Sequence, residues 1–360
     1  MRIVALRALG LGDLLTAVPA LRALREWAAG GRVPLDVGGV DAHRHSTRVV
    51  VAAPAALAPL VRLAGCKPLT AAPLAPLAPE AHGADLLVNL HGRGPQSHRV
   101  ALAARPKRLI AFAHPDVPES REMPAWRADE HETCRWCRLL EESGVPADPT
   151  RLALPDPGAP PPGVDLPGAT VVHPGAASGA RRWPAARFAH VAAAEARAGR
   201  RVVITGSPGE RALAEEVARR AGLDAGAVLA GRTDLAQLAT VVARAGRVVC
   251  GDTGVAHLAT AFATPSVLLF GPTSPLLWGP PIPPTRPIPR TSPASTAPSP
   301  LRWGTPIPPA SPTAPIPPAG PPRHRVLWAG RTGNPHAAQP DPGLLAIEPA
   351  DVIGELATLP

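Results

Sequence analysis

One stretch, Arg247-Val248-Val249-Cys250-Gly251-Asp252-Thr253-Gly254-Val255-Ala256-His257, leads from an apolar strand through a turn of small residues into a helix. The first N–H groups of a helix have no intrahelical partner, and the helix dipole places positive charge at the same end. An imidazole on the first turn adds a further polar group beside these N–H groups. The stretch therefore predicts a site for a phosphate or diphosphate.

The sequence around this stretch alternates apolar and amphipathic segments. Strands are expected at 170–172, 201–205, 228–229, 247–250 and 266–270, and helices at 184–197, 210–221, 234–245 and 255–263. Repeated strand and helix units of this length predict a parallel sheet with helices on both faces.

The first half of the chain shows the same alternation. Strands are expected at 2–7, 34–37, 86–90 and 108–112, and helices at 13–27, 54–64, 96–104 and 131–143. Between 154 and 168 the chain is rich in Pro, Gly and Asp and loses its periodicity, which is typical of a linker. We therefore expect an α/β protein with a domain at 1–153, a linker at 154–168 and a second domain at 169–360. Such sheets bind ligands beyond the carboxyl ends of their strands.

A proline-rich segment interrupts the second domain. Between 271 and 322 no packed helix or strand is expected, and the run Leu276-Leu277-Trp278-Gly279-Pro280-Pro281-Ile282-Pro283-Pro284 returns as Leu301-Arg302-Trp303-Gly304-Thr305-Pro306-Ile307-Pro308-Pro309. We interpret 285–318 as a disordered insertion, either an expanded loop without function or a partner site of the polyproline kind. Order is expected to resume at 323–328, with a strand at 344–347 and a closing helix at 350–359.

The composition limits the classes of function. The 360 residues carry a net charge of +9, but the chain has no Tyr and its basic residues are scattered, so a nucleic-acid surface is not supported. Weak attraction to an anionic membrane remains compatible with this charge. The opening apolar run, 3–24, is interrupted too often for a membrane span or a signal peptide, so a cytoplasmic location is expected.

The four cysteines are expected to be reduced. Cys134 and Cys137, with His131 nearby, have the spacing of one half of a zinc site. A structural zinc site needs four ligands, usually from two separated pairs, and no second pair follows. An ordinary helix face is therefore preferred, and no metal is expected.

Three turns carry candidate site residues. In the first, Gly10 and Gly12 precede Asp13 at a helix start, where the carboxylate serves either as a cap or as a general base. A dinucleotide fingerprint would need a third Gly, where Leu15 stands. A nicotinamide-dependent oxidoreductase is therefore disfavoured.

The other two turns follow strands of the second domain. After 170–172, Arg181 and Arg182 could pair with a diphosphate, or one or both could be solvated. After 201–205, Gly206 allows a tight turn and Glu210 could cap a helix or accept a ribose hydroxyl. All of these residues lie at the carboxyl ends of parallel strands, so they are expected to form one site.

The sequence resembles glycosyltransferase family 9, which includes the heptosyltransferases of lipopolysaccharide core synthesis. The resemblance is carried by Leu11-Gly12-Asp13-Leu14-Leu15-Thr16-Ala17-Val18-Pro19-Ala20-Leu21, by His173-Pro174-Gly175 with Arg182-Trp183-Pro184, and by Asp252-Thr253-Gly254 with His257-Leu258-Ala259 and Phe270-Gly271-Pro272. It implies the GT-B architecture, in which two Rossmann-like domains face each other across a cleft. The acceptor would bind to the first domain and the nucleotide-sugar to the second.

The resemblance also implies roles for individual residues. Asp13 is implied as the catalytic base, the Asp252-Thr253-Gly254 turn with His257 as the diphosphate site, and Glu210 as the ribose contact. Arg181 stands where many heptosyltransferases have a phosphate-binding lysine, which keeps the charge but changes its geometry.

The expected reaction is an inverting glycosyl transfer without metal or other cofactor, in which Asp13 deprotonates an acceptor hydroxyl. The implied donor is a nucleoside-diphosphate sugar, with ADP as one expected nucleotide and heptose or a related sugar as the group transferred. The implied acceptor is a cell-envelope glycan or a lipid-linked glycan, reached through peripheral contact with the inner face of the membrane. Two alternatives stay open, a nucleotide-sugar epimerase or hydrolase of the same fold, and a non-catalytic nucleotide-binding protein that recruits partners through its Pro-rich segment.

Overall fold

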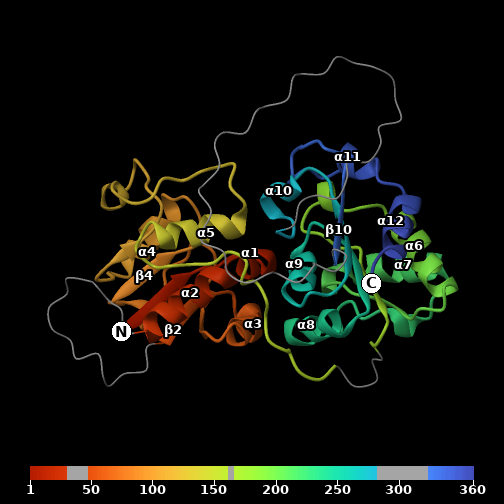
Figure 1. Ribbon diagram of the computed structural model, residues 1–360, viewed down its shortest axis with the longest axis horizontal. Helices are drawn as coiled ribbons and strands as arrows, with labels where there is room; N and C mark the ends of the chain where they lie inside the picture. Colours follow the sequence, from red (N-terminus) through yellow and green to blue (C-terminus); the bar gives the residue numbers. More distant parts are fainter. Residues whose placement is uncertain (31–47, 161–165, 282–322) are drawn as a thin grey trace, which may run out of the picture.

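A computed structural model describes residues 1–30, 48–160, 166–281 and 323–360. The strand expected at 34–37 and the insertion expected at 285–318 lie outside these ranges. The described chain forms two separate five-stranded sheets, both wholly parallel, as the α/β alternation predicts (Figure 1).

The first sheet has the strand order β3-β2-β1-β4-β5. Its strands are β1 (Arg2–Leu6), β2 (Arg48–Ala53), β3 (Lys67–Thr70), β4 (Leu86–Asn89) and β5 (Leu109–Ile110). Its helices are α1 (Leu11–Thr16), α2 (Val18–Ala29), α3 (Ala58–Leu63), α4 (Gln96–Ala103) and α5 (Glu132–Glu141). Because β1 is central, the turn that follows it lies in the middle of the carboxyl edge of the sheet.

The second sheet has the order β10-β9-β8-β6-β7. Its strands are β6 (Thr170–His173), β7 (Val202–Ile204), β8 (Arg247–Gly251), β9 (Ser266–Phe270) and β10 (His324–Trp328). Its helices are α6 (Ala185–Arg197), α7 (Arg211–Ala221), α8 (Leu235–Arg244), α9 (Gly254–Ala261), α10 (Pro275–Trp278), α11 (Pro342–Leu345) and α12 (Pro349–Ala357). Here β8 is central, so the Asp252 turn takes the same place in this sheet as the Asp13 turn takes in the first.

Alternate residues of each strand face opposite sides of the sheet. On β1, Ile3 and Ala5 pack into a cluster that continues into the second half of the molecule, whereas Val4 and Leu6 pack into a separate cluster on the far side. On β8, Val248 and Cys250 belong to the shared cluster, and Val249 to a third one with α6 and α12. The shared cluster joins the two halves on the side where α1 contacts α9 and α3 contacts α8.

The expected helix at 13–27 is two helices. The chain breaks at Ala17, which ends α1 and begins α2. Pro19 explains the break, because it has no N–H to donate to the carbonyl four residues earlier. Two strands, β2 and β3, were not predicted from the sequence. The first is an apolar run that falls between the expected elements, and the second lies at the sheet edge, where its Pro68 is tolerated.

Three further expectations for the second half were wrong. Residues 228–229 make only an isolated bridge, Ile204 to Val228, instead of a strand. The strand expected at 344–347 is instead preceded and overlapped by α11, because the Asp341 carboxylate caps the Gly343 N–H at 2.7 Å and Pro342 occupies the first turn. The same combination, Ser274 as cap and Pro275 after it, forms α10 inside the segment where no helix was expected.

No helix in the described parts of the chain is long and apolar enough to cross a membrane.

Candidate active site

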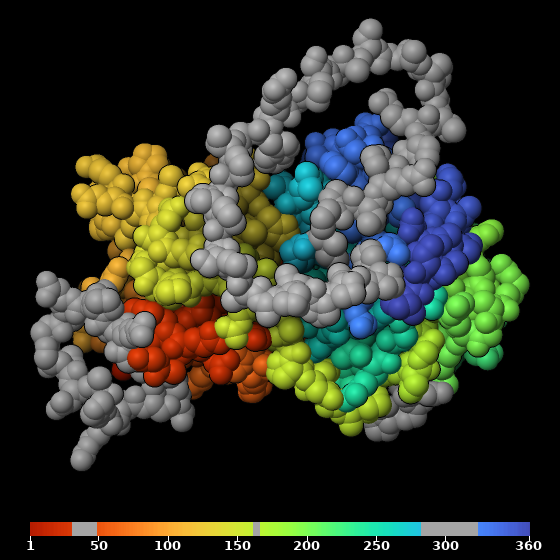
Figure 2. Space-filling model, viewed as in Figure 1, coloured from red at the N-terminus to blue at the C-terminus, as the bar shows by residue number. Residues whose placement is uncertain are grey.

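A cavity of about 1030 Å³ lies where the carboxyl edges of the two sheets face each other. In the space-filling view the first half, red to yellow, and the second half, green to blue, lie side by side (Figure 2). The lining includes the predicted residues Gly10, Gly12, Asp13, Arg181, Gly206, Glu210, Asp252, Thr253, Gly254 and His257. Turns that are up to 240 residues apart in sequence thus share one cavity, as their positions after parallel strands predict.

Two glycines allow the turns of the two halves to approach closely. A Cβ at Gly12 would lie 2.8 Å from Cδ2 of His257, and a Cβ at Gly254 would lie 2.7 Å from Cβ of Leu11. Real Cβ atoms essentially never come this close to another heavy atom. The absence of both side chains therefore sets the spacing between α1 and α9.

Asp13 is the third residue of α1 and not its N-cap, a place taken by Gly10. Its Oδ2 accepts the Gly10 N–H at 3.1 Å, and its Oδ1 lies 3.5 Å from the Arg7 guanidinium. The side chain keeps 29% of its surface exposed and lines the cavity. The carboxylate thus stabilises the start of the helix and faces the cavity at once, so the predicted alternatives of cap and base do not exclude each other.

Arg181 and Asp252 form an ion pair on the opposite wall. Arg181 Nη1 lies 3.7 Å from Oδ2 of Asp252, and its Nε donates to Ser178 Oγ at 3.4 Å. Because the Asp252 side chain is 7% exposed and that of Arg181 is 23% exposed, the cation is the partner that is more open to the cavity. The arrangement suits Arg181 for contact with an anion and Asp252 for holding it in place.

Arg182 is the one predicted site residue that does not line the cavity. It is exposed, and its Nε donates to the Ala176 carbonyl at 2.9 Å. The extended backbone at Arg182 turns its side chain away from that of Arg181. Of the two neighbouring arginines, only Arg181 is in place to meet a ligand in this cavity.

The start of α9 presents N–H groups to the cavity. Thr253 is the N-cap, and its hydroxyl accepts the Val255 N–H at 3.1 Å. The first turn keeps further N–H groups that no intrahelical carbonyl satisfies. Together with the positive end of the helix dipole, these groups give the start of α9 the geometry expected of an anion site.

His257 is the fourth residue of α9, and the centroid of its ring lies 6.3 Å from the centroid of the Trp278 ring. Burial, opposed in part by Asp252, lowers the pKa of His257 to about 4. The imidazole is therefore neutral at pH 7 and contributes hydrogen bonding instead of positive charge to the anion site.

Glu210 and Gly206 lie in the turn after β7. Oε2 of Glu210 accepts from both N–H and Oγ of Ser207 at 2.8 Å. Its carboxylate also packs so closely on Gly175 that no Cβ fits there. Burial lowers the pKa of the neighbouring His173, whose Nδ1 lies 3.0 Å from Thr205 Oγ1. These contacts hold Glu210 at the wall, where it can accept from a hydroxyl group.

Part of the cavity lining was not predicted from the sequence. It comes from Ala55, Ala56, Pro59, Thr233, Asp234, Leu235, Leu238, Thr273, Trp278, Pro335 and His336. Pro335 also accepts a hydrogen bond from Ser178 at 2.5 Å, so this segment supports the turn that carries Arg181. These residues lack a motif at a strand end, although the caps Ser274 and Asp234 mark the nearby helices α10 and α8.

Cys134 and Cys137 lie on α5, and burial raises the pKa of the Cys137 thiol to about 12. Within the residues that the structure describes, no group of three or more His, Cys, Asp or Glu side chains is arranged to hold a metal ion.

Residues 128–290 match the model of glycosyltransferase family 9 (heptosyltransferase). No curated protein sequence matches the chain.

Several solved structures are similar to this one. The E. coli ADP-heptose lps heptosyltransferase II has a TM-score of 0.66 and 18% identity, over 99% of this chain and 98% of that one. The glycosyl transferase family 9 protein of Veillonella parvula DSM 2008 has a TM-score of 0.60 and 21% identity, over 78% and 83%. E. coli heptosyltransferase WaaC with ADP has a TM-score of 0.54 and 19% identity, over 78% and 90%. The two parallel sheets and these likenesses agree on the GT-B fold.

Proposed function

We propose that the chain is a glycosyltransferase of family 9, which moves a sugar from a nucleoside-diphosphate sugar to a hydroxyl group of a separate acceptor, with inversion and without a metal ion. One observation carries this proposal. The Asp13 carboxylate, the Arg181 guanidinium and the start of α9 line one cavity. A transfer reaction needs a base on one side of the reacting carbon and a place for the leaving group on the other.

On the donor side, the diphosphate would lie against the first turn of α9 and the Arg181 guanidinium. As the bond from the anomeric carbon to the diphosphate oxygen breaks, negative charge grows on that oxygen. The helix N–H groups and Arg181 are fixed before the reaction, so they stabilise this charge without reorganising. Neutral His257 can add a hydrogen bond, and Glu210 is placed to accept from a ribose hydroxyl.

On the acceptor side, Asp13 would take the proton of the attacking hydroxyl as its oxygen bonds to the anomeric carbon. The electron pair of the breaking bond leaves with the diphosphate. Attack from the face opposite the leaving group inverts the configuration at this carbon. We assign acceptor binding to the first predicted domain, 1–153, and donor binding to the second, 169–360.

The proposal that no metal is needed rests on the positive groups already present at the anion site. A magnesium ion would supply the same neutralisation of the diphosphate. If Arg181 and α9 suffice, transfer rates in EDTA should equal those in added Mg²⁺. A rate that collapses in EDTA and returns with Mg²⁺ would contradict this part of the proposal.

The finer identity of the substrates is also a proposal. Similarity to heptosyltransferases supports an ADP-linked heptose, or a related sugar, as donor. We propose a cell-envelope glycan or glycolipid as acceptor. The net charge of +9 supports peripheral contact with the anionic inner face of the membrane and hence a cytoplasmic location. Calorimetry with ADP, UDP and GDP would rank the nucleotides.

The central test is Asp13→Asn. Removal of a general base should lower kcat by roughly a thousandfold. The affinity for ADP should stay nearly unchanged, because Asp13 lies on the other wall. Asp85→Asn is the matched control, since Asp85 also pairs with a basic residue, Lys107 at 2.7 Å, but lies at the opposite edge of the sheet. An Asp13→Asn enzyme as active as this control would refute the assignment of the base.

A further inference from the structure

Arg7 follows β1 directly and is 1% exposed. Its guanidinium is enclosed by acceptors from three segments of the first half, which are α1, the end of β4 and α5. Nε donates to the Asp13 carbonyl at 2.8 Å, Nη1 to the Leu90 carbonyl, and Nη2 to Thr16 Oγ1 at 3.3 Å. A buried cation with this many partners holds one fixed position, because each lost hydrogen bond to it would be costly.

Nη2 of Arg7 lies between two carboxylates. It is 3.0 Å from Oε1 of Glu132 and 3.5 Å from Oδ1 of Asp13. Glu132 begins α5, more than a hundred residues further along the chain. Arg7 thus joins the predicted base to the start of α5.

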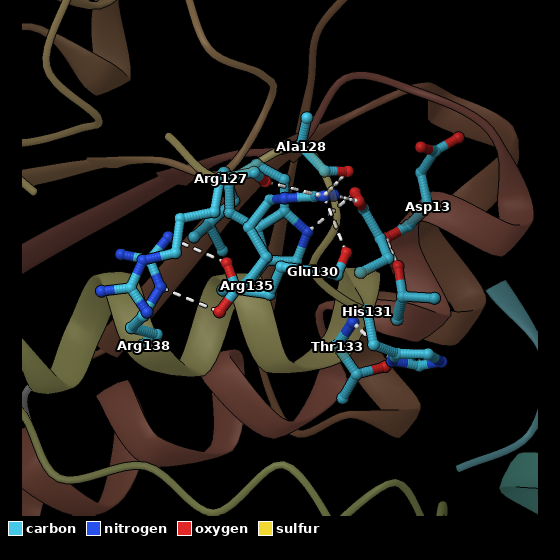
Figure 3. A network of polar contacts seen from close by, with 12 residues as sticks. Asp13, Arg127, Ala128, Glu130, His131, Thr133, Arg135 and Arg138 are labelled. Carbon is cyan, nitrogen blue, oxygen red and sulfur yellow. Dashed lines mark hydrogen bonds and ion pairs between the residues drawn. The ribbon is translucent and has the colours of Figure 1, made fainter. Parts of the chain in front are cut away.

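Glu132 is itself held firmly. Trp136 Nε1 donates to its Oε1 at 3.0 Å, and Arg135 pairs with its Oε2. Arg7 also lies over the Trp136 ring, 4.6 Å from its centroid. Figure 3 shows the polar contacts around the start of α5, with Asp13 at one side of the view, Arg135 in the middle and Arg138 at the other side. Glu132 therefore cannot move away from Arg7 without breaking these contacts.

The two carboxylates lie at different distances from Arg7. The shorter pair of Arg7 is with Glu132, which also pairs with Arg135. Asp13 keeps a longer pair with Arg7 on Oδ1 and accepts the Gly10 N–H on Oδ2.

We propose that Arg7, held in place by Glu132, is a positioning residue that fixes the Asp13 carboxylate toward the cavity. The inference rests on the proposed function, because it presumes that Asp13 is the base.

The alternative is that Arg7 and Glu132 merely stabilise the fold, as buried ion pairs can be costly to break. The chain offers a matched control on the same helix. Arg138 is similarly buried, and its Nε and Nη2 pair with Glu130 at 2.8 Å each. It also lies over an aromatic ring, that of Phe112, at 5.3 Å. Neither Arg138 nor Glu130 pairs with Asp13.

The test compares Arg7→Met, Arg7→Lys, Glu132→Gln and Arg138→Met by kcat, KM and thermal unfolding. Loss of positioning should lower kcat by about 100-fold in Arg7→Met, with the KM of the donor little changed. Arg7→Lys, which keeps the charge but not the fork of donors, should recover part of this loss. If Arg7→Met does not fold, Arg7→Lys and Glu132→Gln carry the test.

The comparison of kcat with the KM of the donor supplies the signature that a structural role would not produce. Arg7→Met and Glu132→Gln should lower kcat with the KM of the donor little changed, whereas Arg138→Met should keep the wild-type kcat even where it unfolds at a lower temperature.

The outcomes separate the two proposals. If Asp13→Asn is inactive and the Arg7 and Glu132 variants behave like Arg138→Met, the positioning role is overturned and the base assignment stands. If Asp13→Asn is active, the proposed function fails first, whatever the other variants do.

Discussion

The two turns that face each other across the cavity are built alike, and the ion pairs at them expose opposite charges. Each turn follows the central strand of a parallel sheet and leads into a helix. Asp13 pairs at 3.5 Å with Arg7 of its own turn, and Asp252 pairs at 3.7 Å with Arg181, which comes from the turn after β6. In the first, Arg7 is buried and Asp13 faces the cavity. In the second, Asp252 is buried and Arg181 faces the cavity.

This difference teaches how one architecture provides both halves of a transfer site. Burying the arginine leaves an accessible carboxylate, and burying the aspartate leaves an accessible cation. The buried partner in each case fixes the side chain that can meet a ligand. The predictions that follow would break the correspondence between the turns or sharpen it.

The largest effect should come from pushing the turns apart. Gly254→Ala places a Cβ 2.7 Å from Cβ of Leu11, an atom fixed to its backbone, so one helix must shift. A displacement of about 1 Å can cost about 100-fold in rate, and we expect a loss of this order in kcat. Gly12→Ala should cost less, because the His257 ring can rotate away.

Gly226→Ala is the control for both variants, since its Cβ would meet no atom within 4 Å. Steady-state rates at saturating donor would show the difference. Equal rates in Gly254→Ala and Gly226→Ala would mean that the spacing of the turns does not limit transfer.

The next effect concerns the exposed cation. Arg181→Ala should raise the Kd for ADP by roughly 10-fold to 100-fold, the range that one charged hydrogen bond gives. Arg181→Lys should recover part of the affinity. Arg182→Ala is the neighbouring control and should change Kd less than about twofold. Calorimetry would measure all three, and a larger effect at Arg182 would reverse the assignment of the two arginines.

The smallest effect concerns the neutral imidazole of the second turn. The pKa of His257 is about 4 in the folded chain and 6.5 without perturbation, so the unfolded chain binds the extra proton between these values. The stability that neutral His257 contributes should be complete above pH 6.5 and should be lost as the pH falls toward 4, by less than about 3 kcal/mol.

Urea unfolding at pH 7.5, 6.5, 5.5 and 4.5 would measure this loss. His257→Gln should have a flatter dependence on pH than the wild type. His324→Gln, which removes another buried histidine with a pKa of about 4 far from the turns, should flatten it similarly. A His257→Gln slope identical to that of the wild type would show that His257 titrates normally.

The sequence predicts the motifs at strand ends well, because a turn between a parallel strand and a helix has strong local signals. Asp13, Arg181 and Asp252 could be placed in one site from these signals alone. The parallel direction of the strands follows similarly from the alternation of strands and helices, whereas the strand order came from the structure alone. By contrast, the helix at 342–345 was mistaken for a strand because its apolar residues outweighed the Asp-Pro start signal.

Contacts between distant segments could not be predicted. Glu132 pairs with Arg7 across 125 positions, and neither residue belongs to a motif. The choice between Arg181 and Arg182 depends on the backbone angle at one residue, which neighbouring residues of the same type do not reveal. Which member of an ion pair is buried is likewise a property of packing and not of the local sequence.

The placement of these partners has a mechanical consequence. Every described residue that forms a hydrogen bond or ion pair with Arg7 belongs to the first half. Every described partner of Arg181 belongs to the second half. Between the halves, His131 Nε2 and the Gly279 carbonyl form a hydrogen bond of 2.9 Å, and the shared hydrophobic cluster packs across the same boundary. If the halves separate to release product, the contacts of Arg7 and those of Arg181 stay intact. Turnover then requires the two halves to close again and does not require these contacts to form anew.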